Sequence, residues 1–127
     1  MERKLISSGT SWEKLYGYSR AVRVGNSVYV AGTTAVDEKG RVMGDDPYRQ
    51  AKFIFDKIEK ALREAGASMA DVVRVRAFVT DIASWTDVAR AQGEVFSEIR
   101  PAATLVQVSA LVESNLLVEI EADAVIE

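Results

Sequence analysis

Two stretches rich in valine, leucine and isoleucine occupy the end of the chain, and in the second of them apolar and charged residues alternate. This pattern predicts strands over Ala103 to Leu111 and over Leu116 to Ile126. Between them lies Glu113-Ser114-Asn115, a sequence that favours a turn. We therefore expect the two strands to pair with each other as a hairpin.

One face of the last strand is acidic, because side chains alternate along a strand. Its members are Glu119, Glu121 and Asp123. The strand predicted over Val72 to Thr80 carries Arg74 and Arg76 at alternate positions, which would place two cations on one face as well. Opposite charges on neighbouring strands stabilise their pairing, so we expect ion pairs here and consider a catalytic carboxylate as the alternative.

The first part of the chain predicts three further strands. A short one lies around Lys4 to Ser7, and alternating residues continue from Tyr18 to Val24 and from Ser27 to Gly32. Gly25-Asn26 separates the second and third strands and is a turn-forming pair. These two strands are expected to form a hairpin.

Two helices are predicted by apolar residues at helical spacing. The first begins at Asp46-Pro47, a capping residue followed by a first-turn proline, and ends at Gly66. The second begins at Ser84, which forms a possible capping box with Asp87. Its expected buried side consists of Trp85, Val88, Ala91, Val95 and Phe96.

The order of elements indicates an α+β fold, with a single mixed β-sheet of about six strands and two helices on one face. We expect residues 1–127 to form a single domain. The sheet face without helices would carry a mixture of charged and polar residues among small and apolar ones. They are Arg74, Arg76, Gln107, Ser109, Glu119 and Glu121. Such a surface suits contact with another subunit.

Composition excludes several kinds of site. The chain has no cysteine and no histidine, which excludes a thiol nucleophile, a Ser-His triad and most zinc sites, and we expect no metal or other cofactor. A net charge of −3 argues against a nucleic-acid partner. We find neither a signal peptide nor a segment of transmembrane length, so we expect no membrane association and a cytoplasmic location.

Five segments in order resemble the RidA (YjgF) family of reactive-intermediate deaminases. They are Gly25-Asn26 before a strand, Ala65-Gly66-Ala67-Ser68, Phe78-Val79-Thr80-Asp81, Arg100-Pro101-Ala102, and Val118-Glu119-Ile120-Glu121-Ala122. The resemblance covers nearly the whole chain. It implies a chorismate-mutase-like fold, a homotrimer, and ligand clefts between subunits.

The resemblance also implies which residues form the cleft. Deaminating members use an arginine directly after the Pro-Ala pair to hold the substrate carboxylate, and a glutamate on the last strand to help water attack the imine. The matching residues here are Ala103 and Glu119, so the chain is a divergent member that lacks the arginine. Tyr18 matches a tyrosine that lines the cleft. Thr33 and Leu105 stand where the family often has a glutamine and a small or thiol-bearing residue.

Alanine cannot bind an anion, whereas arginine donates charge-assisted hydrogen bonds to a carboxylate. Arg100, three residues before Ala103, and Arg20, two residues after Tyr18, are the candidate replacements, and we favour Arg100. The alternative for both is a structural role, with Arg100 pairing with Glu98 or the end of a helix and Arg20 facing solvent.

We therefore expect a trimer that binds a small anionic or carbonyl-bearing metabolite between subunits, without standard imine deaminase activity. A first alternative is an enamine or imine hydrolase of the 2-iminobutanoate/2-iminopropanoate deaminase type, in which Glu119 positions water. Endoribonuclease activity or translation inhibition, which has been attached to parts of this family, is the second alternative, and the lack of histidine and the acidic charge disfavour it. A purely structural or partner-binding trimer is the third.

Overall fold

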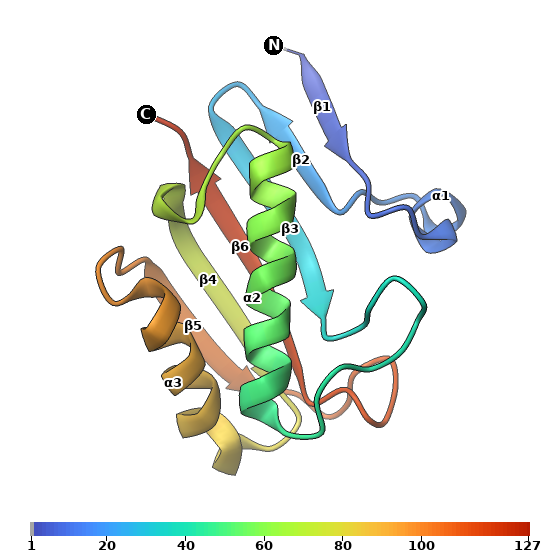
Figure 1. Ribbon diagram of the computed structural model, residues 1–127, viewed down its shortest axis with the longest axis vertical. Coiled ribbons are helices and arrows are strands. Elements are labelled where there is room, and N and C mark those ends of the chain that lie inside the picture. The colour runs from blue at the N-terminus through green and yellow to red at the C-terminus, as the bar shows by residue number, and fades with distance from the viewer. Residues whose placement is uncertain (1) are drawn as a thin grey trace.

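The computed structural model describes residues 2–127, which form one six-stranded sheet with both long helices on the same face (Figure 1). The order of strands across the sheet is β1-β2-β3-β6-β4-β5. Their bounds are β1 Arg3–Ile6, β2 Ala21–Val24, β3 Ser27–Thr34, β4 Val72–Val79, β5 Ala102–Gln107 and β6 Val118–Val125. The fold is therefore α+β with a mixed sheet, as the sequence predicts.

The predicted hairpin between the last two strands is wrong. Strand β5 pairs in parallel with β4 at the sheet edge, whereas β6 lies antiparallel between β3 and β4. One face of β6 is completely buried and consists of Val118, Ile120, Ala122 and Ala124. A strand with such an apolar face is most stable at the centre of the sheet, so the segment after β5 crosses to that position instead of turning back locally.

Helix α2 (Pro47–Glu64) follows the prediction closely. The Asp46 side chain accepts a hydrogen bond from the Arg49 backbone nitrogen (2.8 Å), and Pro47 occupies the first turn. The apolar stripe of the helix packs on the sheet, with Ile54, Phe55, Ile58 and Leu62 all buried.

Helix α3 (Trp85–Phe96) packs beside α2 but begins differently from the prediction. The Ser84 hydroxyl donates to the Asp81 carbonyl oxygen (2.7 Å), and the capping box with Asp87 does not form. Asp81 instead caps a short 3₁₀ turn, η2 (Ile82–Ser84), that leads into the helix. Trp85 is also not part of the core, because 53% of its surface is exposed.

The strand predicted from Tyr18 begins only at Ala21, because an unpredicted short helix, α1 (Ser11–Tyr16), precedes it. Gly17 ends α1 with a left-handed backbone (φ 74°). Tyr18 and Arg20 therefore lie in the connection between α1 and β2. A second 3₁₀ turn, η1 (Met69–Asp71), connects α2 to β4.

The helix-free face carries the expected ion pairs in part. Arg76 on β4 contacts Glu121 (3.2 Å) and Asp123 (3.6 Å) on β6, and all three side chains are partly exposed. Gln107 and Ser109 are not on this face. Gln107 pairs with the buried Val79 and accepts a hydrogen bond from the Ile82 backbone (2.8 Å), whereas Ser109 lies beyond the end of β5.

No helix within residues 2–127 is long and apolar enough to cross a membrane.

Candidate functional site

The sheet separates the predicted site residues into two groups. Ala77 on β4 pairs with Ile120 on one side and with Leu105 on the other, so these three side chains share the face covered by the helices. Glu119 is one residue away from Ile120 and faces the opposite way. Glu119 and Leu105 consequently lie on opposite faces of the same sheet.

The first group surrounds the Glu119 carboxyl. Glu119 lies on β6 beside Gly32 of β3, and a side chain at position 32 would collide with its carboxylate. Burial raises the pKa of the Glu119 carboxyl, with a further increase from Glu121, while the positive charge of Arg20 opposes the shift. A half-buried carboxyl is a candidate to exchange a proton with a bound ligand, and its raised pKa keeps it protonated to a higher pH than an exposed glutamate.

Arg20 is held close to this carboxyl. Its Nη2 atom donates to the Gly32 carbonyl oxygen, while its Nε atom is buried with no hydrogen-bond partner among the described residues. Burial lowers the pKa of Arg20, and the charges of Tyr18, Glu13 and Glu119 raise it. Tyr18 is 40% exposed. We call Tyr18, Arg20, Gly32 and Glu119 the Glu119 cluster.

Thr33 does not join this cluster. It pairs with Ile120, is completely buried on the helix-covered face, and donates its hydroxyl hydrogen bond to the Ala31 carbonyl oxygen (2.7 Å). It therefore supports the backbone at the end of β3 and has no surface for a ligand to contact.

Lys57 of α2 lies behind the Glu119 cluster and was not recognised from the sequence. Its Nζ atom donates to the carbonyl oxygens of Thr34 (2.7 Å) and Val36 (2.9 Å). Burial, with a smaller contribution from Arg20, lowers the pKa of Lys57 to about 8. Its position three residues after Ile54 and four before Ala61, inside the apolar stripe, is the signal that could have identified it.

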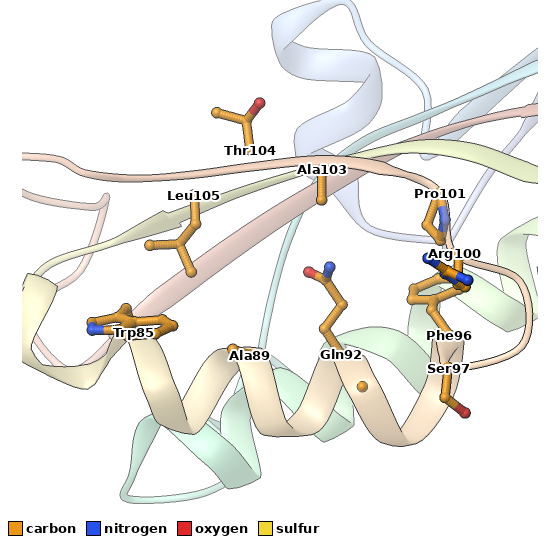
Figure 2. Close-up of a pocket in the computed structure, with 11 residues that line it drawn as sticks. Trp85, Ala89, Gln92, Phe96, Ser97, Arg100, Pro101, Ala103, Thr104 and Leu105 are labelled. Carbon is orange, nitrogen blue, oxygen red and sulfur yellow. The ribbon is translucent and has the colours of Figure 1, made fainter.

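The second group lines an open groove between α3 and β5, with a cavity of about 360 Å³. Figure 2 shows Ala103 and Leu105 of β5 pointing toward α3, and Thr104 pointing away. Gln92 of α3 points toward β5. Trp85 lies at one end of the groove and Arg100 at the other, beside Phe96 and Pro101. We call this the α3/β5 groove. Trp85, Gln92 and Phe96 were not among the predicted site residues.

Arg100 occupies an unusual backbone conformation in this groove. It is the single non-glycine residue within 2–127 with a positive φ (57°), and it follows the end of α3, where its nitrogen donates to the Phe96 carbonyl oxygen (2.8 Å). This conformation costs a non-glycine residue about 1 to 2 kcal/mol. Its guanidinium forms no ion pair with the described residues, so the pairing with Glu98 that was the alternative to ligand binding is absent.

The two regions differ in what they can do chemically. The Glu119 cluster offers a carboxyl group that can exchange a proton and a part-buried cation, Arg20. The α3/β5 groove offers an apolar surface with one amide and one guanidinium, and no group that transfers a proton near neutral pH. No set of three or more acidic side chains within residues 2–127 is placed to hold a metal ion.

A family model described as Endoribonuclease L-PSP matches residues 10–126. Among curated proteins, an uncharacterized protein of Streptomyces coelicolor is 36% identical over 119 residues, covering 94% of this chain and 89% of that protein. A 2-iminobutanoate/2-iminopropanoate deaminase of Dermatophagoides farinae is 32% identical over 126 residues, covering 98% of each chain.

Solved structures match the whole fold. A member of the YjgF/YER057c/UK114 family from Mycobacterium tuberculosis superposes with a TM-score of 0.91 at 47% identity, covering 98% of this chain and 100% of that one. RidA from an Antarctic Psychrobacter superposes with a TM-score of 0.82 at 31% identity, covering 97% and 94%.

Proposed function

Because this chain belongs to the YjgF/RidA family, which the endoribonuclease L-PSP model describes, we propose that it forms a homotrimer and binds a small metabolite in clefts between subunits. Each cleft combines the Glu119 cluster of one subunit with the α3/β5 groove of the next. The ligand is anionic or carries a carbonyl group, and standard imine deamination is weak or absent.

The placement of the two regions on opposite sheet faces is the observation that carries this proposal. A ligand small enough for the groove cannot reach Glu119 of the same chain through the sheet. A second copy solves this problem if its helix-free face approaches the groove. That face is suited to contact, since Tyr29 and Val106 are exposed on it beside the Arg76 ion pairs.

The weak deaminase activity follows from Ala103. It lies in the groove where a deaminase would present its carboxylate-binding arginine, and an alanine methyl group offers no donor. The proton-transfer half of the cleft is retained, but the substrate is no longer anchored opposite it. Positioning contributes several kcal/mol to such reactions, so its loss is sufficient to reduce the rate strongly.

Sedimentation velocity of the purified protein tests the assembly. We expect a species of three times the 13.9 kDa chain mass. A monomer at micromolar concentration would contradict the proposal, because a cleft of two half-sites could then not form.

Imine deamination remains the second candidate function, since a relative that is 32% identical has that name and Glu119 is retained. Ammonia release from imines of small amino acids, generated in the assay, distinguishes the two. Fast release that depends on Glu119 would favour the deaminase, whereas little release from a stable trimer would favour the binding protein.

A further inference from the structure

The α3/β5 groove has a defined polarity along its length. Trp85 and Leu105 provide an apolar surface at one end, and Phe96 and Arg100 lie at the other. Between them, the Gln92 amide points toward β5, and the small residues Ala89 and Ala103 leave room beside it (Figure 2). Of the lining residues that the structure describes, Arg100 alone is charged. The groove is therefore complementary to a molecule with an apolar body and a single anionic end.

The backbone at Arg100 gives no reason for an arginine. A left-handed residue between a helix and a strand is normally glycine, which adopts this conformation without steric cost. The arginine is nevertheless present, its guanidinium lacks an ion pair within residues 2–127, and it lines the groove. The side chain is exposed, so it is available to a ligand, and the backbone outlier makes Arg100 a candidate for a ligand contact.

We propose that the α3/β5 groove binds an amphipathic carboxylate, with its carboxylate on Arg100 and an aromatic or branched aliphatic body against Trp85 and Leu105. This inference rests on the proposed function in that it assigns the ligand class of the same cleft. Arg100 takes the place of the carboxylate-binding arginine that the family resemblance implies at position 103. The space beside the small Ala103 side chain admits the apolar body of the ligand. A cavity of about 360 Å³ is large enough for a small amphipathic carboxylate.

The test uses phenyl-substituted carboxylates with one to four methylene groups, their neutral amides, and butanoate as a carboxylate without a ring. Binding is measured through the Trp85 indole N–H signal in nitrogen-15 NMR, in a Trp12→Phe background that removes the other tryptophan. We expect the best phenyl carboxylate to bind at least about tenfold more tightly than its amide, because a charged hydrogen bond contributes that much. It should also bind more tightly than butanoate.

Arg100→Gly is the decisive variant. It should reduce carboxylate affinity to that of the amide, leave amide binding unchanged, and leave the Tm unchanged or raised by up to about 4 °C, because the left-handed strain is relieved. Arg90→Gln, which removes an exposed positive charge from the same helix outside the groove, is the matched control and should keep the carboxylate preference.

Equal affinity for carboxylate and amide, a preference that survives Arg100→Gly, or no binding by any probe would overturn the inference. The same samples are examined by sedimentation. A trimer that fails to bind the probes would contradict only the ligand class, whereas a monomer would contradict the proposed function.

Discussion

The Glu119 cluster and the α3/β5 groove differ in the chemical groups that each presents. The cluster places Glu119 against Gly32, where any side chain would displace the carboxylate, and a part-buried arginine, Arg20, lies near it. The groove has alanine at position 103, and Arg100 at one end is the charged residue among its described lining. In the cleft that we propose, the Glu119 cluster is the proton-transfer half and the groove is the recognition half.

This difference teaches that the two halves of the proposed cleft can change independently. Each is built on a different sheet face and different elements, so a substitution in one leaves the packing of the other intact. The predictions below separate the two halves, beginning with the contact that would bring them together.

The largest effect should come from a charge placed on the helix-free face. Val106→Asp introduces a carboxylate where we propose that subunits meet, and a buried unpaired charge costs several kcal/mol. The trimer should dissociate at concentrations where the wild type remains assembled, as measured by sedimentation. Lys60→Asp on the exposed side of α2 is the control and should not affect assembly. An intact Val106→Asp trimer would remove this face from the interface.

Ala103→Arg should restore part of the recognition half. The new guanidinium lies in the groove and can hold a substrate carboxylate, so ammonia release from imines of small amino acids should rise about tenfold to a hundredfold in kcat/KM. Ala103→Gln adds a similar length without the charge and should give no such gain. Robust, Glu119-dependent release by the wild type would instead show that the missing arginine is dispensable.

Glu119→Gln and Glu121→Gln should separate function from stability. The pKa of the Glu119 carboxyl is raised, so the native state holds a proton that the unfolded state releases, and wild-type stability falls as pH rises above the ordinary value of 4.5. Glu119→Gln should remove this fall and abolish any imine hydrolysis. Glu121→Gln should leave hydrolysis intact and cost less than about 1 kcal/mol, because its ion pair with Arg76 is partly exposed.

These stabilities are measured by urea unfolding from pH 4 to 8. If both variants had the same effect on hydrolysis with unchanged stability, the distinction between the two glutamates would have to be abandoned.

Lys57 should give the most specific effect, because it is confined to stability at high pH. Its pKa is lowered to about 8, so below that pH the native state carries a disfavoured charge. The penalty disappears as pH rises from about 8 to the ordinary value of 10.5, and stability should rise over this window. The stability of the Lys57→Met variant should not rise over this pH window, whereas that of Lys60→Met, on the same helix, should rise as in the wild type. Urea unfolding across this window measures the difference, and identical profiles would contradict the assigned environment of Lys57.

The sequence predicted the fold class because the signals involved are local. Asp46-Pro47 begins α2 and Gly66 ends it, and the acidic face of β6 meets Arg76 as alternation requires. The position of β6 was missed because a turn sequence does not specify which strand the chain joins next. Alternation also could not separate Glu119 from Ala103, since the face of each residue depends on the register between strands far apart in sequence.

The candidate site was predicted in part for the same reason. Tyr18, Arg20 and Glu119 come together, and Arg100, Ala103 and Leu105 share the groove, but Thr33 is buried away from both. Trp85 was assigned to the core because helical spacing does not distinguish a side chain under the sheet from one beside its edge. Arg100 could not be recognised as strained, because its φ depends on how α3 ends.

The central claim is that the two halves meet across a subunit boundary, and the absence of native cysteine allows a direct test. One chain carries only Ala103→Cys, and a second chain of distinguishable size carries only Tyr18→Cys. The two are mixed, reassembled and treated with a short bifunctional maleimide. We predict a covalent pair of the two different chains, and no such pair when Lys60→Cys replaces Tyr18→Cys. Failure of the Ala103 and Tyr18 cysteines to link in an assembled protein would contradict the account.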